Sequence, residues 1–418
     1  MQGNAFRGII VIILTYAHTS QGRQNLMGHI PGKVFIISGK RTPFGKFGGS
    51  LSALSPIDLA VLTTQKLLAE LSLAPESIDQ VIFANVLPVT PDTLYGGRHI
   101  ALKSGMKVTT PGVSVNRLCG SGIQGLIDAA RIIRCEEAEA IVVSGAEAMS
   151  MSPHLIYGSR FGTKFGSLPT KDLLLDTLYD KHAALPMGNT AENLAQEFKI
   201  SREESDRYSY ESHQKANQAY LDGLLQPEIM SVDLGRSQLD RDEHLRGDIS
   251  LEDLHKLKPT FIKDGTVTAG SASGIVDGGA SLLIASEAFI KKHKLTPIAE
   301  IIGGEVVGVD PSKMGIGPVP AIQQLLTRFK LDVQDIDLFE INEAFAPQVM
   351  ACQKALEIPK ERLNIWGGAI ALGHPLGATG LKISLTLARQ LQHYKKEYGI
   401  SSACIGGGQG IALLMRKA

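Results

Sequence analysis

The sequence predicts an α/β protein made of two similar halves, with a separate segment inserted into it. Three observations support this fold class. Apolar runs of strand length alternate with amphipathic helical stretches, the same order of elements recurs after 258 positions, and a polar segment, 149–263, interrupts the alternation. Because the strand runs are apolar throughout, each half should hold a sheet that is covered by helices on both faces.

The first half is expected to span residues 33–148 and to be completed by 264–292. Residues 39–50 are basic and rich in glycine, so they are expected to form a loop. The expected strands of this half are 33–38, 79–84, 113–115, 140–144 and 280–284, and its expected helices are 56–71 and 122–134.

The inserted segment, 149–263, is richer in Lys, Asp, His, Tyr and Pro than its surroundings and has few strand-like runs. It is expected to form a mainly helical or irregular lobe, with helices at 190–199 and 202–222. The second half is expected to span 293–418. Its expected strands are 299–302 and 338–341, and a helix is expected at 381–391.

An internal repeat relates the two halves. A shift of 258 positions matches Gln65 with Gln323, Leu67 with Leu325, Ile78 with Ile336 and Asp79 with Asp337, without a gap. Cys119 and His374 fall within three residues of the same place in the two copies. The repeat therefore predicts a pseudo-twofold pair of halves in which these two side chains face one shared pocket.

The composition excludes several classes of partner. The chain carries 42 basic and 42 acidic residues, so its charge points neither to nucleic acid nor to an anionic membrane. Its four cysteines form no C-x-x-C pair, so we expect no metal site and no disulfide scaffold. A reducing compartment fits these cysteines, and we expect the cytoplasm.

Residues 1–32 are interpreted as an N-terminal extension outside the fold. The first 57 residues contain no Asp or Glu, and the apolar run 8–14 is shorter than the ~20 residues that span a bilayer. A targeting segment is one interpretation, with the mitochondrial matrix as the location. We favour an upstream start that precedes the true one at Met27. No other stretch is long and apolar enough to span a membrane.

Four side chains stand where α/β proteins build reactive sites. His374 lies in a stretch with five glycines just before a helix, and Cys119 lies among glycines between a strand and a helix. There, N–H groups and the helix dipole should stabilise a thiolate. Cys404 ends an apolar strand, and Asn342 follows another. From the residues alone, a structural histidine, a core cysteine and a helix-capping asparagine remain alternatives for His374, Cys404 and Asn342.

Together, these motifs strongly resemble those of the thiolase family, from about Lys33 to the C-terminus. The resemblance implies a layered α-β-α-β-α fold with an inserted loop domain that binds coenzyme A. Segments 160–166, 185–188 and 315–320 look most like the mitochondrial-type 3-ketoacyl-CoA branch. The four motifs that carry the likeness are 116–122, 342–346, 373–377 and 404–410.

The resemblance also implies a role for each reactive group. Cys119 would be acylated, and His374 would take its proton and later activate the CoA thiol. Cys404 would move a proton at the α-carbon of the acetyl-CoA half. Asn342 would hold a water that forms one oxyanion hole with His374, and the N–H groups of Cys119 and Gly406 would form the other.

CoA would be a substrate, and no prosthetic group is expected. By resemblance, Arg246 would contact the nucleotide end of CoA and Ser273 its pantetheine, and Met187 and Ala269 would belong to the same site. One departure from the family is Ile249, which stands where close relatives carry a hydroxyl that helps hold CoA.

The expected reaction is cleavage of a 3-ketoacyl-CoA by CoA, and its reverse, in fatty-acid β-oxidation. Pro186 stands where acetoacetyl-specific relatives carry His, which favours a broader acyl range. The alternatives are an acetoacetyl-CoA-forming biosynthetic enzyme, a ketosynthase-type condensing enzyme, which would replace Cys404, and an acyl-CoA carrier on the same scaffold. The resemblance implies a homodimer or homotetramer, and a β-oxidation multienzyme partner is a further hypothesis.

Overall fold

A computed structural model of the chain describes residues 32–235 and 237–418, and the part from Lys33 to Ala418 forms one compact unit. The extension expected over residues 1–32 lies, apart from Gly32, outside the described residues. Within the described ranges, no helix is both long and apolar enough to cross a membrane.

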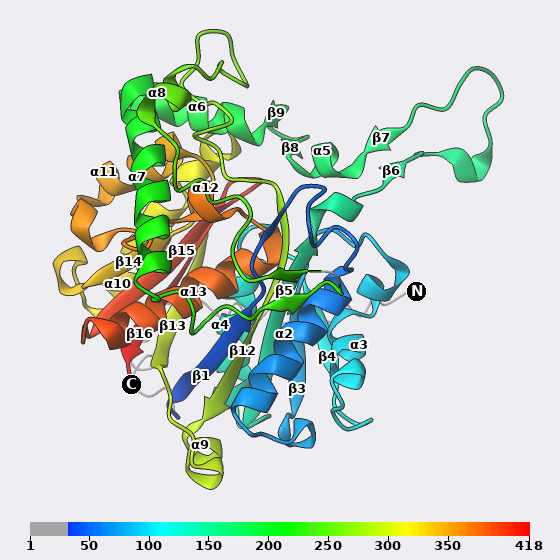
Figure 1. The fold of residues 1–418 in the computed structure, drawn as a ribbon, viewed down its shortest axis with the longest axis vertical. Coiled ribbons are helices and arrows are strands. Elements are labelled where there is room, and N and C mark those ends of the chain that lie inside the picture. The colour runs from blue at the N-terminus through cyan, green and yellow to red at the C-terminus, as the bar shows by residue number, and fades with distance from the viewer. Residues whose placement is uncertain (1–31, 236) are drawn as a thin grey trace, which may run out of the picture. The chain divides into compact units, whose positions relative to one another are not determined.

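A mixed ten-stranded sheet runs through this unit in the order β14-β15-β16-β13-β1-β12-β5-β3-β4, with β2 paired to β12 (Figure 1). The strands are β1 Val34–Arg41, β2 Gly45–Lys46, β3 Gln80–Ala84, β4 Gly112–Val115, β5 Ala140–Ala148, β12 Val276–Ser286, β13 Ala299–Gly308, β14 Leu338–Ile341, β15 Tyr398–Ile405 and β16 Gln409–Lys417.

The strand pairing repeats the pattern of the sequence. In the first half β3 is parallel to β5, and β5-β12-β1 follow antiparallel. In the second half β14 is parallel to β15, and β15-β16-β13 follow antiparallel. Two residue pairs between β1 and β13 join the halves. The two predicted copies therefore share one topology and meet at the middle of the sheet.

Helices α4 and α13 form the central layer, because each contacts the other and strands of both halves. Every residue from Leu376 to Ala388 of α13 is buried. The two helices cross at glycines, and a Cβ at Gly122 would lie 2.7 Å from the Leu381 nitrogen. The helices of the two halves are α2 Pro56–Glu70, α3 Gly96–Lys103, α4 Ser121–Arg134, α9 Glu287–His293, α10 Pro318–Phe329, α11 Ala346–Leu356, α12 Ala369–Leu372 and α13 Leu376–His393.

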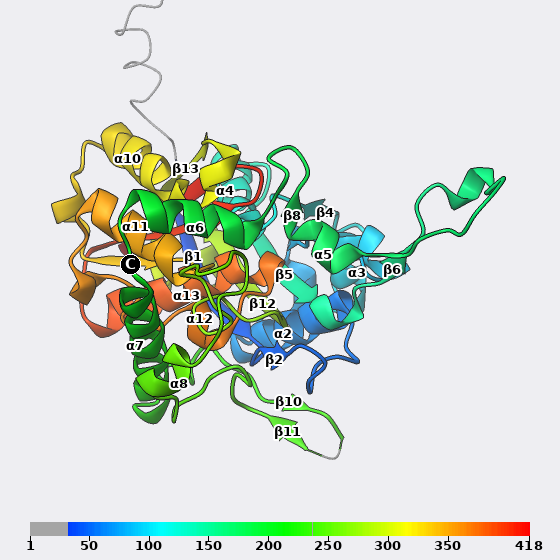
Figure 2. The ribbon, with the colours of Figure 1, turned by 90° about the horizontal axis from the view of Figure 1, so that it is seen from above.

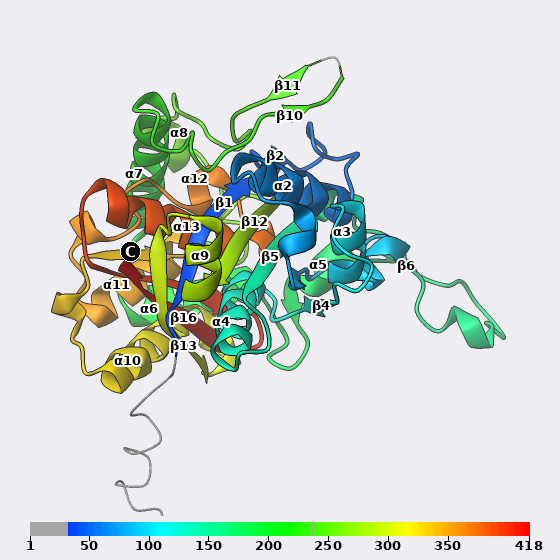
Figure 3. The same cartoon turned by 90° about the horizontal axis from the view of Figure 1, so that it is seen from below.

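The inserted segment is helical and irregular, as expected. Figure 2 shows its long helices beside α11 and α12 of the second half. A hairpin arm with β6 and β7 at its base extends away from them (Figures 1 and 3). The elements of the segment are β6 His154–Leu155, β7 Lys171–Asp172, α5 Leu173–Thr177, β8 Tyr179–Asp180, β9 Leu185–Pro186, α6 Met187–Glu197, α7 Arg202–Leu221, β10 Val232–Asp233, β11 Gln238–Leu239 and α8 Leu251–His255.

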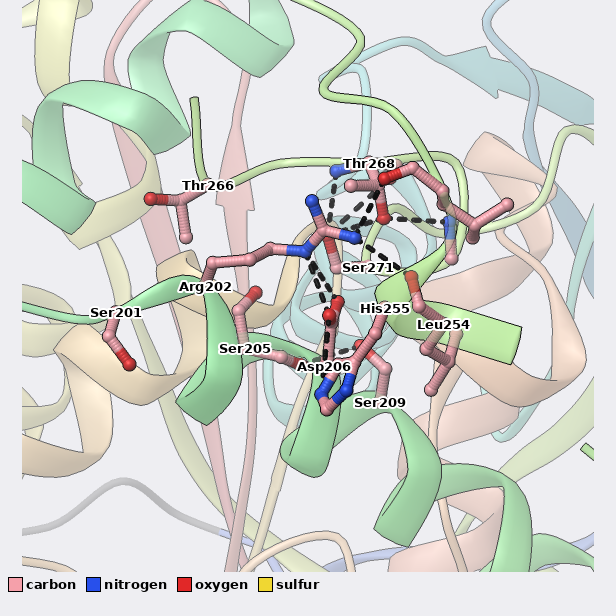
Figure 4. A network of polar contacts seen from close by, with 12 residues as sticks. Ser201, Arg202, Ser205, Asp206, Ser209, Leu254, His255, Thr266, Thr268 and Ser271 are labelled. Carbon is pink, nitrogen blue, oxygen red and sulfur yellow. Dashed lines mark hydrogen bonds and ion pairs between the residues drawn. The ribbon is translucent and has the colours of Figure 1, made fainter. Parts of the chain in front are cut away.

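Buried ion pairs hold this segment in place. Arg41 of β1 is fully buried and binds Glu228 and Asp242, each at 2.8 Å. Within the segment, Arg202 of α7 binds Asp206 and donates to the Leu254 carbonyl at 2.8 Å, which ties α7 to α8 (Figure 4). A buried arginine needs such partners, because an unpaired charge in the interior is costly.

The structure corrects several boundaries. The strands expected at 280–284 and 299–302 are the longer β12 and β13, and the loop expected at 39–50 contains β2. The strand expected to end at residue 38 continues to Arg41, whose charge the two carboxylates compensate. Strand β5 continues past residue 144 to Ala148, with every residue buried. Helix α13 begins at Leu376 and not at 381, because tertiary burial outweighs the poor helix propensity of its glycines.

Candidate active site

A strained turn presents Cys119 between β4 and α4. Leu118, immediately before it, has φ +47°, a left-handed conformation that costs a non-glycine residue free energy. The Leu118 N–H donates to the Asn116 side chain at 3.0 Å, and the Arg117 N–H donates to Ser121 Oγ at 2.8 Å. These bonds hold the turn in the conformation that exposes the thiol.

The sulfur of Cys119 is half-buried and meets a turn from the other half of the chain. The backbone N–H groups of Gly406 and of Cys119 itself donate to it and lower its pKa, as expected. Burial acts in the opposite direction and more strongly, so the pKa of Cys119 is raised to about 11. The N–H groups therefore stabilise the thiolate less than burial destabilises it, and the thiol needs a base to take its proton.

His374 lies two residues before α13 and is buried. The Thr379 hydroxyl lies 2.6 Å from Nδ1 and donates its own hydrogen to the Pro375 carbonyl, so Nδ1–H must donate to Thr379. Nε2 is therefore the ring nitrogen that carries the lone pair. Burial lowers the pKa of His374 to about 4, which keeps the ring neutral and able to accept a proton at neutral pH.

Asn342 and Cys404 lie beside these groups. The Asn342 amide nitrogen is 3.3 Å from His374 Nε2, where the resemblance implied a shared water. Asn342 Oδ1 is buried and has no hydrogen-bond partner among the residues that the structure describes. Cys404 is fully buried, and burial, followed by the neighbouring Cys119, raises its pKa well above the ordinary value. It is therefore a neutral thiol.

A cavity of about 480 Å³ opens beside His374, within the ~300–1,000 Å³ typical of ligand sites. Two predicted CoA residues, Met187 and Ser273, line it, and so does Pro186. Most of the remaining lining is apolar: Met149, Leu175, Leu178, Tyr179, Phe261, Ile275, Phe345 and Leu376. Such a lining suits an acyl chain better than a polar substrate.

The other two predicted CoA residues lie outside this lining. Arg246 is exposed, and its backbone N–H donates to His213 Nδ1 at 3.3 Å. Ala269 is exposed in the turn that Thr268 and Ser271 stabilise, where the Thr268 N–H donates to Ser271 Oγ at 2.9 Å. The structure thus places Cys404 and Gly406 beside Cys119, and Asn342 beside His374. Met187 and Ser273 line the cavity together with His374, whereas Arg246 and Ala269 lie on the surface.

Comparison with known families decides the identity. The family model described as the thiolase N-terminal domain matches residues 34–288, and the one described as the thiolase C-terminal domain matches residues 295–417. The chain belongs to the thiolase family. It is thus an acyltransferase that acts on CoA thioesters, and the predicted family and fold class are confirmed.

Individual relatives of this thiolase cover nearly its whole length. It is 46% identical to the human mitochondrial 3-ketoacyl-CoA thiolase, over 92% of this chain and 98% of that protein. It is 40% identical to a β-ketothiolase of Cupriavidus necator, over 92% and 99%. The crystal structure of the human enzyme in complex with CoA superposes with a TM-score of 0.91 at 45% identity, over 93% of this chain and 98% of that one. The acetyl-CoA acetyltransferase of Bacillus anthracis superposes with a TM-score of 0.89 at 39% identity, over 93% and 99%.

Sequence reasoning missed two residues that hold the site of this thiolase. Thr379 fixes the tautomer of His374, and its hydroxyl in an otherwise apolar stretch was the available signal. Glu147, fully buried at the end of β5, accepts hydrogen bonds from the Leu87 N–H at 2.8 Å and the Gly377 N–H at 2.9 Å. Burial raises the pKa of Glu147 to about 7. A lone carboxylate inside a predicted apolar strand was the signal for it.

The lowered pKa of His374 predicts an unusual pH profile. The neutral, proton-accepting ring is lost only as the pH falls through about 4, whereas an ordinary histidine would lose it near 6.5. We therefore expect kcat/KM for thiolysis to stay level from about pH 8 down to about pH 5 as far as this group is concerned. A variant of the exposed His182, H182N, should give the same profile. An acid limb with its midpoint between 6 and 7, present in both the wild-type enzyme and H182N, would contradict the assignment.

Proposed function

We propose that this thiolase cleaves 3-ketoacyl-CoA with CoA, in fatty-acid β-oxidation, and that it also catalyses the reverse condensation. One observation carries the proposal: a half-buried sulfur accepts two backbone N–H groups, and a neutral imidazole lines an apolar cavity. The human relative is named a 3-ketoacyl-CoA thiolase. The name of the human relative also describes it as mitochondrial. This name supports the mitochondrial matrix as the alternative location of this thiolase, beside the cytoplasm.

The first half-reaction forms an acyl-enzyme. His374 Nε2 takes the proton of Cys119, and the sulfur adds to the ketone carbon of the substrate. The N–H groups of Cys119 and Gly406 hold the oxyanion of this adduct. The C2–C3 bond then breaks, and its electron pair passes to acetyl-CoA as an enolate, whose oxygen the Asn342–His374 pair holds. Cys404 gives its proton to C2 of that enolate.

The second half-reaction transfers the acyl group to CoA. His374 passes the proton that it took from Cys119 to the Cys404 sulfur, which gave its own proton to C2. The imidazole is then free to activate the CoA thiol. The CoA sulfur adds to the acyl carbon, and Cys119 leaves and regains a proton. Two separate half-reactions predict ping-pong kinetics.

CoA is proposed to reach the site along the inserted segment. Met187 and Ser273 line the cavity and would contact its pantetheine end, and the exposed Arg246 would meet a phosphate of its nucleotide end. Ala269 belongs to the same proposed surface. We propose that residues 149–263 form the loop domain that binds CoA. This domain is inserted into the first half, 33–148 plus 264–292, and residues 293–418 form the second half.

The assembly is proposed to be a homodimer or a homotetramer. Strand β4 is one of the two edge strands of the sheet, and its Val113 is half-exposed. The hairpin arm exposes Phe161 and Phe165 almost completely, at 92% and 99%. Apolar side chains on a free edge and on an extended arm are typical of protein–protein contacts.

A panel of chain lengths tests the substrate range. Because Pro186 and its neighbours make the cavity apolar, we expect the enzyme to cleave 3-ketoacyl-CoAs longer than the four-carbon one. Activity on the four-carbon substrate alone would contradict this and would favour the alternative, an acetoacetyl-CoA-forming biosynthetic enzyme. The Bacillus relative is named an acetyl-CoA acetyltransferase.

A cavity-filling variant sharpens the same test. L178W places a large ring where Leu178 lines the cavity. It should lower kcat/KM on the longer substrates roughly tenfold or more and leave the four-carbon substrate within about twofold. L221W, at an exposed position on α7, is the matched control and should leave the whole panel unchanged.

A further inference from the structure

Two turns from opposite halves of the chain meet at the sulfur of Cys119. One turn, 116–120, carries Cys119, and the other, 406–408, carries Gly406 and joins β15 to β16, whose first residue is Gln409. They are in close contact, since a Cβ at Gly406 would lie 3.2 Å from Leu118 Cδ1. The two N–H groups proposed as the oxyanion hole therefore come from separate parts of the fold.

Arg117 joins these two turns. Its Nη1 donates to Oε1 of Gln409 at 2.8 Å, across 292 residues of sequence, and its Nε donates to Oε1 of Gln124 at 2.8 Å. Gln124 is buried, and its Nε2 donates to Asp128 at 2.7 Å, which fixes the orientation of the amide. The planar guanidinium is thus held at both ends by directed hydrogen bonds.

Neither Arg117 nor Gln409 belongs to the lining of the cavity beside His374. The guanidinium instead donates to two side-chain amide oxygens. One belongs to Gln124 on α4, which follows Cys119, and the other to Gln409 at the start of β16, which follows the turn with Gly406. A charged side chain held in this way fixes the position of one turn relative to the other.

We propose that Arg117 and Gln409 are a positioning pair that aligns the Gly406 N–H with the Cys119 N–H and sulfur. The inference rests on the proposed function, because it concerns the oxyanion hole of that reaction. The alignment matters because both N–H groups must point at one oxygen, and a misplacement of about 1 Å costs roughly a hundredfold in rate.

The first test is kinetic. R117M and Q409L should each lower kcat for thiolysis about tenfold to a hundredfold, with KM for CoA unchanged within about twofold. Because the two residues act as one unit, the double variant should be no slower than the slower single variant. Q409E retains an oxygen acceptor for the guanidinium and should recover most of the rate. R207M removes an exposed arginine of α7 that does not belong to this network and is the control.

The second test measures the reactivity of the Cys119 sulfur directly. In a C135A background, which removes the exposed cysteine, the rate of Cys119 alkylation by iodoacetamide at pH 8 follows its thiolate fraction. Both R117M and Q409L should slow alkylation several-fold, since a displaced Gly406 N–H no longer stabilises the thiolate. The other groups around the sulfur, Glu147, His374 and Cys404, are unchanged in both variants. Q409L also keeps the arginine charge. Slower alkylation in that variant would therefore result from a displaced Gly406 N–H and not from the loss of a positive charge.

Two outcomes would overturn the proposal. A rise in KM for CoA with unchanged kcat would make Arg117 a substrate-binding residue, and unchanged kcat together with unchanged alkylation would remove any positioning role. If R117M does not fold, Q409L carries the same tests. If the wild-type enzyme shows no acyl transfer at all, the proposed function fails, whereas alkylation still decides whether the pair positions the sulfur.

Discussion

Replacing Cys119 with alanine is expected to abolish both thiolysis and condensation, by roughly a thousandfold or more. The reason is that every proposed step uses a thioester on this sulfur, and no other thiol occupies its place between the Cys119 and Gly406 N–H groups. Incubation with a 3-ketoacyl-CoA should give no acyl adduct on the protein by intact mass. CoA binding by calorimetry should stay within about twofold, because the cavity and its Met187 and Ser273 walls are unchanged.

Cys135 provides the matched control for that experiment. It is exposed at the end of α4, outside the cavity, and C135A should keep the wild-type rate and the wild-type adduct mass. Acetyl-CoA release by C119A would contradict the proposed nucleophile, and a loss of CoA binding in C119A would show that the substitution acts on the fold and not on the chemistry.

Much of the fold could be predicted because its signals are local. Continuous apolar runs located β3, β14 and the start of β5, and the register between Gln65 and Gln323 revealed the repeat before any strand pairing was known. The boundaries that failed depend on distant partners. Arg41 stays in a strand only because Glu228 and Asp242 meet it, and both are far away in the sequence.

The site was predictable in its residue types and less so in its electrostatics. Glycines around Cys119 and His374 were visible in the sequence, and the structure brings both to the same region. The balance between N–H donation and burial at Cys119 was not visible, because burial depends on the packing of both halves. The contact between Arg117 and Gln409 was equally hidden, since nothing local links residues 292 positions apart.

The burial of Cys404 is consistent with its proposed role as the acid of the first half-reaction. Cys404 packs among Ala344, Phe345 and partly buried Met187, without an ionic partner in that cluster. Burial and the neighbouring Cys119 both raise its pKa, so the proton stays on the sulfur until a stronger base, the enolate carbon, needs it. The same apolar surroundings keep water from competing for that proton.

Replacing Cys404 with serine should therefore lower thiolysis and condensation roughly a hundredfold to ten-thousandfold, because a hydroxyl is a far weaker acid than a thiol. Cys119 should still accept an acetyl group from acetyl-CoA, since that transfer needs no proton at C2. Exchange of the acetyl-CoA methyl protons with D₂O should be lost, and proton NMR measures it. C352S, which also places a hydroxyl at a buried cysteine, controls for the change in packing and should keep both activities. If C404S turns over at the wild-type rate, then some other group protonates the departing enolate, and Cys404 has no part in that step.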